Sequence, residues 1–249
     1  MPGFASHRSY QQFAESVMTR WRYVSHPEQR AFLRALLETS VARQEVIGCG
    51  SRLWRAQLGQ DCYPPDLTRE EQPAPLDIQR MKPLGDRARE GRANPKGIPY
   101  LYLATHKDTA IAEVRPWIGA YVSIAQFALQ RDVRVVNCVT NDDRIMVYAQ
   151  EPEPEERERA TWRDIDRAFS QPVTCADDRA DYVPTQIIAE FLRANGIDGV
   201  AYRSSLGLGH NVMLFDIDVA ALVNCGLVEI RALTLDWSEA ANPYCVQPK

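Results

Sequence analysis

The sequence lacks the spacings that hold a metal ion or point to a disulfide framework. Its six cysteines form no CxxC pair, and no histidine lies near two of them. Zinc sites usually present such pairs, so we expect the protein to bind no metal. A chain of 249 residues can bury a sufficient core without cross-links. We therefore interpret the cysteines as reduced thiols without a chemical role, as is usual in a cytoplasmic protein.

Long apolar runs and a large excess of basic residues are also missing. No stretch approaches the roughly 20 apolar residues that cross a bilayer, and the N-terminal residues MPGFASHRSYQQF lack the apolar core of a signal peptide. The net charge is −4, whereas a surface that binds nucleic acid is usually basic. These absences predict a cytoplasmic protein that contacts neither membranes nor nucleic acid directly.

Helical periodicity marks the N-terminal part of the chain. Residues 9–24 carry apolar side chains at helical spacing, and a second helix is expected after Pro27. This second helix has a wide apolar side, formed by Phe32, Leu33, Leu36, Leu37 and Val41. A side this wide is expected to contact two surfaces. We predict a helical appendage over residues 1–48, with the second surface provided by the first helix, by another copy of the chain in a homo-oligomer, or by a partner protein.

Residues 49–249 show short strand patterns and helices in no regular alternation. Strands are expected at residues 52–58, 98–104, 133–139, 198–205, 211–215 and 227–235. Helices are expected at residues 105–114, in a segment ending near residue 170, and at 183–195, with a long loop at residues 60–90. Because the strands and helices do not alternate as βαβ units, their order predicts an α+β domain rather than a doubly wound sheet.

The stretch GRANPKGIPYLYLATHKDTAIAEV, residues 91–114, contains the most informative polar residues. Glu113 borders the apolar side of the expected short helix, where a carboxylate is costly unless a charged group meets it. Arg92, in the turn-prone segment before the strand, is expected to share its cleft. Arg55, within the strand at residues 52–58, is interpreted either as a surface charge or as a side chain that reaches the same site.

This stretch resembles the RES domain, a family named after arginine, glutamate and serine. The resemblance is carried by GRxNPKGxPxLYLA followed by TAIAEV, and later by YRSS, a glycine-containing turn and a strand that begins with asparagine; it covers roughly residues 50–220. It implies that residues 49–249 form a catalytic domain with an ADP-ribosyltransferase-like fold, in which a split antiparallel β-sheet surrounds a cleft for NAD. It also implies an NAD-consuming toxin whose partner is an antitoxin with an Xre-like helix-turn-helix part.

The resemblance also assigns site residues one at a time. The family positions correspond to Arg92, Tyr102, Glu113, Ser204 and Asn211. Ser204 is chosen because it directly follows Tyr202-Arg203 at the end of the strand, with Ser205 as the alternative. NAD is the expected substrate rather than a resident cofactor. The expected catalytic residues are Arg92, Glu113 and Ser204, and the expected NAD-binding residues are the same three with Arg55, Tyr102 and Asn211.

The chemistry of these residue types fits cleavage of the bond between nicotinamide and ribose. Such cleavage develops positive charge on the ribose, which Glu113 could stabilise, while the guanidinium of Arg92 could bind the diphosphate at two points. Tyr102 could stack on the nicotinamide ring, and Ser204 could hydrogen-bond the ribose or the carboxamide. The structural alternatives are an ion pair between Arg92 and Glu113, a core tyrosine and a turn serine.

Other functions stay open at this point. The same residues would serve an ADP-ribosyltransferase that modifies a macromolecule, because an acceptor need not leave a motif. Hydrolysis is likewise not distinguished from phosphorolysis. A non-catalytic binding protein on the same fold would act through the N-terminal helices or through the long loop at residues 60–90, whose end is rich in arginine and lysine. The complete set of arginine, tyrosine, glutamate and serine favours an enzyme, because a pure binder has no need of it.

Overall fold

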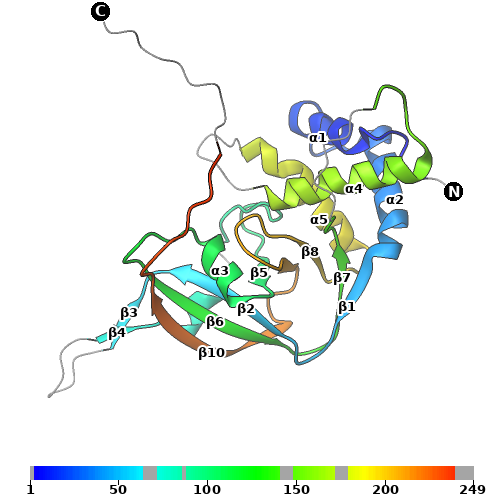
Figure 1. The fold of residues 1–249 in the computed structure, drawn as a ribbon. Coiled ribbons are helices and arrows are strands. Elements are labelled where there is room, and N and C mark those ends of the chain that lie inside the picture. Colours follow the sequence, from blue (N-terminus) through cyan, green and yellow to red (C-terminus); the bar gives the residue numbers. More distant parts are fainter. Residues whose placement is uncertain (1–2, 64–71, 86–87, 141–147, 172–178, 239–249) are drawn as a thin grey trace, which may run out of the picture.

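The computed structural model describes residues 3–63, 72–85, 88–140, 148–171 and 179–238. Its α-helices are α1 Ser9–Thr19, α2 Pro27–Ser40, α3 Lys107–Glu113, α4 Pro154–Ser170 and α5 Val183–Ala194. Its strands are β1 Gln44–Ile47, β2 Arg52–Leu58, β3 Asp61–Tyr63, β4 Gln72–Ala74, β5 Leu101–Ala104, β6 Tyr121–Leu129, β7 Val133–Asn137, β8 Gly199–Arg203, β9 His210–Leu214 and β10 Ala220–Glu229. Short 3₁₀ turns are η1 Val41–Arg43, η2 Ile78–Met81 and η3 Arg179–Tyr182. The expected α+β class is confirmed (Figure 1).

One large sheet is divided near its middle. Its strand order is β1-β7-β8-β9-β5-β2-β6-β10, and neighbouring strands are antiparallel except for the parallel pair β7 and β8. β2 is registered against β6 over its whole length, whereas its described register against β5 is the pair Trp54 and Ala104. The sheet therefore splits between β2 and β5, as the expected ADP-ribosyltransferase-like fold requires. The short helix α3 packs on the strands at this division (Figure 1).

The two edge strands of this sheet differ from the sequence-based expectation. β1, which pairs with β7, was not predicted. The last strand is β10 rather than residues 227–235, because its backbone pairs with β6 from residue 220 to residue 229. Leu235 and Trp237 alternate as in a strand, yet they are 83% and 79% exposed, and the described residues 231–238 form no strand. An alternating pattern of apolar residues therefore does not show whether a segment has a neighbouring strand with which to pair.

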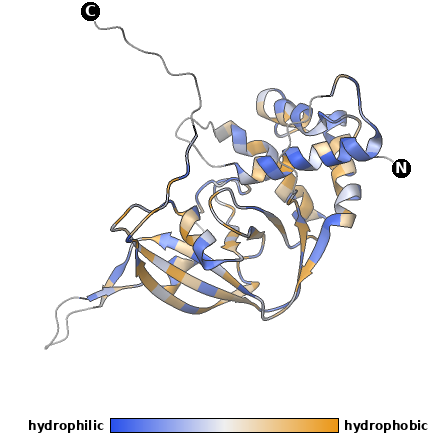
Figure 2. Cartoon of the chain, in the orientation of Figure 1, coloured by the Kyte–Doolittle hydropathy of each residue, from blue (hydrophilic) through white to orange (hydrophobic). Residues whose placement is uncertain are grey.

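The N-terminal helices pack into the same hydrophobic core as α4 and α5. Leu36 of α2 is fully buried and shares one cluster of side chains with Trp162 of α4 and Ile188 of α5. Figure 2 shows hydrophobic residues along the strands of the sheet and many hydrophilic residues on the visible side of α4. The division of the chain into an appendage and a catalytic domain stays a prediction. Removal of residues 1–48 would expose the shared core.

The wide apolar side of α2 is largely covered within the chain. Phe32 stacks on Phe13 of α1, with ring centroids 4.3 Å apart, and Leu33 is buried as well. Val41 is 65% exposed, because it lies in the 3₁₀ turn beyond the helix. α1 therefore provides the second surface, which was one of the expected alternatives. The homo-oligomer stays a prediction, and the solution mass of the full chain would test it.

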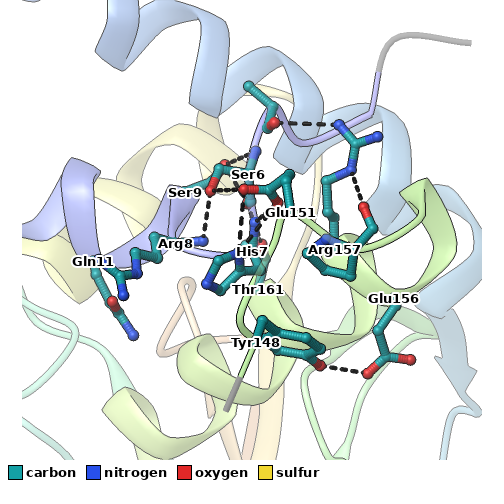
Figure 3. A network of polar contacts seen from close by, with 12 residues as sticks. Ser6, His7, Arg8, Ser9, Gln11, Tyr148, Glu151, Glu156, Arg157 and Thr161 are labelled. Carbon is teal, nitrogen blue, oxygen red and sulfur yellow. Dashed lines mark hydrogen bonds and ion pairs between the residues drawn. The ribbon is translucent and has the colours of Figure 1, made fainter. Parts of the chain in front are cut away.

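Polar contacts attach the N-terminal segment to the residues before α4 (Figure 3). Ser6 Oγ donates a hydrogen bond of 2.8 Å to Glu151, and the backbone N–H of His7 donates another of 2.7 Å. Desolvation opposes the charge on Glu151, but these bonds outweigh it and lower the pKa of its carboxyl. Arg157 of α4 donates to the carbonyl of Ala5 at 3.2 Å. The segment is thus held against the helix whose last residue, Ser170, lines a cavity.

Candidate active site

Two cavities meet where the sheet divides. The first cavity, of about 530 Å³, lies between β2, β5 and α3 and includes Trp54, Arg55 and Leu58 in its lining. The second cavity, of about 380 Å³, is bounded by the segment around Arg92, the end of α4 and the turn after β8. Cavities of this size accommodate small-molecule ligands. The residues that line both, and so lie at their junction, are Tyr102, Glu113, Tyr202 and Asn211.

Glu113 is the last residue of α3 and places its carboxylate at this junction. Its Oε1 accepts a hydrogen bond of 2.8 Å from Ser204 Oγ and one of 2.6 Å from Nδ2 of Asn211 on β9. The structure thus brings together three of the residues predicted from the sequence. Arg92 was expected to share the cleft of this carboxylate, and both residues line the second cavity. The described hydrogen-bond partners of Glu113 are neutral donors, which orient the carboxylate without cancelling its charge.

A glycine-containing turn positions Ser204. Gly209 has φ +88°, and a Cβ on it would lie 2.2 Å from Nδ1 of His106, at the start of α3. A Cβ on Gly207 would lie 2.9 Å from Cα of Thr109, whose hydroxyl donates to the carbonyl of Leu208. Glycine is therefore required for the turn to pack this closely on α3. The consequence is a fixed approach of β8 and its terminal serine to Glu113.

The structure distinguishes the two candidate serines. Ser204 is buried, donates to Glu113, and accepts hydrogen bonds from the backbone N–H groups of Leu206 and Gly207 at 3.1 and 3.2 Å. Ser205 instead donates to the carbonyl of Ser170 at the end of α4. Ser204 therefore contacts the carboxylate, and Ser205 fastens the turn to the helix.

Arg92 lines the second cavity and is held by the helices rather than by Glu113. Its Nη1 donates to the carbonyl of Ala168 on α4 at 2.8 Å, and its guanidinium carbon lies 5.7 Å from the ring centroid of Tyr182. Gln186 of α5 fixes the preceding backbone by donating to the carbonyl of Gly91 at 3.0 Å. The structural alternative, an ion pair with Glu113, is thus not what holds Arg92; contacts with the helices fix its guanidinium at the cavity wall.

Tyr102 forms part of the wall of both cavities. Its hydroxyl donates to Oδ1 of Asn94 at 2.8 Å and accepts from the backbone N–H of Ala93 at 3.2 Å. Burial is the main cause that raises the pKa of the phenol well above its usual value. The phenol therefore stays neutral, and its hydrogen bonds connect β5 to the segment that carries Arg92.

Arg55 reaches the first cavity rather than the outer surface. Its Nη1 donates to the carbonyl of Tyr102 at 3.0 Å, across the division of the sheet. Its Nε is buried and has no hydrogen-bond partner in the part of the chain that the structure describes. Burial lowers the pKa of its guanidinium to about 10. A buried guanidinium with an unsatisfied N–H gains from a hydrogen-bond acceptor on a ligand; the role of Arg55 in binding stays a prediction.

Asp166, a buried aspartate on α4 that is 1% exposed, was not predicted from the sequence. Its Oδ2 accepts hydrogen bonds from the backbone N–H (2.9 Å) and hydroxyl (3.0 Å) of Thr140, just after β7. Its Oδ1 accepts from Ser170 Oγ at 3.1 Å and from the backbone N–H of Arg203 at 3.4 Å. Asp166 thus ties α4 to the end of β8, one residue before Ser204. Its position beside Ile165, on the apolar side of the helix, was the available signal.

No group of histidine, cysteine, aspartate and glutamate side chains suited to a metal ion occurs among the described residues. The described cysteines, Cys49, Cys62, Cys138 and Cys225, are free thiols. Burial raises the pKa of Cys138 far above its usual value, which makes it unreactive. Cys175 and Cys245 lie outside the described residues. No helix in the described part of the chain is long and apolar enough to span a membrane.

The family model of the RES domain matches residues 52–238, which include all the site residues described above. The chain belongs to the RES domain family. The expected resemblance is therefore confirmed. No curated protein sequence matches the chain. Among solved structures, the RES-domain chain is similar to one in the crystal structure of the M. tuberculosis MbcT–MbcA toxin–antitoxin complex, with a TM-score of 0.45 and 16% identity over 79% of this chain and 92% of that chain.

Proposed function

We propose that this RES-domain protein consumes NAD by cleaving the bond between nicotinamide and ribose. The observation that supports this most is the position of Glu113 at the junction of two cavities, with Ser204 and Asn211 bound to one of its carboxylate oxygens. A dinucleotide whose scissile bond lies at this carboxylate would extend into both cavities. Guanidinium groups are available in each, from Arg55 in the first and Arg92 in the second.

In the proposed reaction the C–N bond breaks and its electron pair leaves with neutral nicotinamide. The ribose carbon then carries positive charge, as in glycoside cleavage. Glu113 stabilises this charge or holds a ribose hydroxyl, and the neutral partners of its Oε1 preserve the full negative charge for that purpose. A water, a phosphate or a side chain of a macromolecule adds to the ribose carbon and gives up its proton.

The other residues bind and position the substrate. Arg92 binds the diphosphate with its planar guanidinium. The ring of Tyr102 packs against nicotinamide, while Ser204 and Asn211 hold the carboxylate in place. Arg55 satisfies its buried N–H with a hydrogen-bond acceptor of the ligand, such as the carboxamide oxygen of nicotinamide. All of these roles are proposals that rest on the geometry of this chain together with its membership of the RES family.

We further propose that the protein is the toxin of a toxin–antitoxin pair in the cytoplasm. Consumption of NAD harms the cell that makes the enzyme, so an inhibitory partner is needed. The resemblance to RES toxins implies that this antitoxin carries an Xre-like helix-turn-helix part. Co-expression of the toxin with its neighbouring gene should then restore growth that the toxin alone arrests.

The direct test is incubation of the purified chain with NAD and chromatographic detection of free nicotinamide. We expect release of nicotinamide in step with loss of NAD. Mass spectrometry of the products, with and without phosphate and with added cell extract, distinguishes hydrolysis, phosphorolysis and transfer to a macromolecule. Intact NAD after prolonged incubation at micromolar enzyme would contradict the proposal and favour a binding protein.

A further inference from the structure

The residue that follows α3 and its C-cap has an unusual backbone conformation. Arg115 has φ +46°, and it is the one non-glycine residue with a positive φ among the described residues. Its backbone N–H donates to the carbonyl of Ala112 at 2.9 Å, which closes the end of α3. Helices often end on a left-handed residue, but that residue is usually glycine or asparagine, because a larger side chain is strained there. The chain thus carries a strained arginine at a position that glycine would fill without strain.

Arg115 also lines the second cavity, two residues beyond Glu113. The lining of that cavity therefore includes the guanidinium-bearing residues Arg92 and Arg115 as well as Glu113, whose Oε1 is bound by Ser204 and Asn211. The lining of the first cavity includes one guanidinium-bearing residue, Arg55, beside the apolar side chains of Trp54, Leu58 and Val114. Strained residues are often retained where their side chains serve a site, and this one lies at the wall of the candidate active site.

We propose that Arg115 is a substrate-binding residue that, together with Arg92, holds the diphosphate of the dinucleotide in the second cavity, while the first cavity receives nicotinamide. This inference rests on the proposed function. Nicotinamide is attached to C1′ of the ribose and the diphosphate, through C5′, to C4′, so a ribose at Glu113 can place the two groups in different cavities. Two arginines can bind the oxygens of a diphosphate bidentately, which gives strength and fixed geometry. Arg115 then determines the selectivity for NAD over a nicotinamide nucleoside without phosphate.

The test uses substitutions that relieve the strain while removing the guanidinium. Arg115→Asn and Arg115→Gly both suit a positive φ, so the melting temperature should not fall. We expect the KM for NAD to rise about tenfold or more, the scale of a lost charge-assisted contact, while kcat changes little. Turnover of nicotinamide riboside, which has no phosphate, should be unchanged. Arg115→Lys keeps a cation at the helix end but loses the planar fork, and it should give an intermediate KM.

Lys107→Gln is the matched control. Lys107 is a cation on α3 that lines neither of the two cavities, so the KM of this variant for NAD should equal that of the unmodified chain. An unchanged KM for NAD in both the Asn and Gly variants would overturn the inference. An equal loss on nicotinamide riboside would also overturn it, since the residue would then shape the helix end. Calorimetric titration with ADP-ribose distinguishes failure of this inference from failure of the proposed function. If the unmodified chain binds ADP-ribose more tightly than the Arg115 variants do but does not cleave NAD, only the proposed function is refuted. If the unmodified chain does not bind ADP-ribose, the role of Arg115 is refuted.

Discussion

Asp166→Asn should destabilise the protein and loosen the site at the same time. The carboxylate is buried, and its two oxygens accept four hydrogen bonds from Thr140, Ser170 and Arg203. The substitution replaces one oxygen with an NH₂ group, so two donors face a donor instead of an acceptor. Unsatisfied buried donors cost about 1–3 kcal/mol each. Partial rearrangement leaves a loss of stability of about 3 kcal/mol, or roughly 6–12 °C in melting temperature for a chain of this size.

Thermal unfolding followed by circular dichroism measures this loss, and Asp164→Asn supplies the control. Asp164 lies two residues earlier on α4 and accepts a hydrogen bond of 3.1 Å from Gln11 near the surface. Asp164 is half-buried, and asparagine keeps an oxygen that can accept the hydrogen bond from Gln11, so its substitution should shift the melting temperature by less than about 2 °C. Because Asp166 fixes the backbone next to Ser204, NAD turnover below the melting range should fall in Asp166→Asn as well. A melting temperature for Asp166→Asn within about 2 °C of the unmodified chain would refute the reasoning.

Three further results are expected. Arg92→Lys should weaken NAD binding about tenfold in calorimetry, because lysine lacks the planar fork; an unchanged dissociation constant would count against diphosphate recognition by Arg92. Ser204→Ala should reduce NAD turnover more than Ser205→Ala does, since Ser204 alone of the two contacts Glu113 in the structure, and the reverse order would assign the site to the other serine. Desolvation opposes the charge on Asp198, but hydrogen bonds from Arg131 and the backbone N–H of Arg134 outweigh it and lower the pKa of Asp198. This stabilisation is present above the unfolded pKa of about 3.9 and is lost as the pH falls through the lower folded value. Asp198→Asn should therefore flatten the acid side of the stability curve, and parallel curves would contradict this.

The segment that carries Arg92, Tyr102 and Glu113 could be identified from the sequence because its residues lie close together in the chain. The motif determined which side chains to examine, and α3 and β5 were placed to within a few residues. The contact of Glu113 with Ser204 and Asn211 spans about 90 residues and depends on the pairing of β8, β9 and β5. No local pattern encodes that strand order, so the sequence could place Arg92 in the cleft of Glu113 but could not show that Ser204 and Asn211 bind its carboxylate.

Errors elsewhere have the same physical origin. The interval from residue 60 to residue 90 was expected to be loop, yet its described part contains β3, β4 and η2, which are too short for a periodic pattern to show. The segment at residues 231–235 alternates as a strand, but it pairs with no strand in the described part of the chain. Arg55 could not be assigned to surface or site, because its burial depends on where the sheet divides. The local sequence pattern limits the secondary structures that a segment can adopt, whereas packing against residues distant in the chain determines which of them forms.

The most direct test of the account is the release of nicotinamide from NAD by Glu113→Gln compared with the unmodified chain. Glutamine keeps an oxygen that can accept hydrogen bonds from Ser204 and Asn211, so the fold should be retained while the charge is lost. Asp108→Asn, which removes an exposed carboxylate from the same helix, is the matched control and should release nicotinamide normally. The account predicts at least about a hundredfold loss of turnover in Glu113→Gln, the scale of removing one electrostatic stabiliser. Near-normal release by a folded Glu113→Gln sample would contradict it.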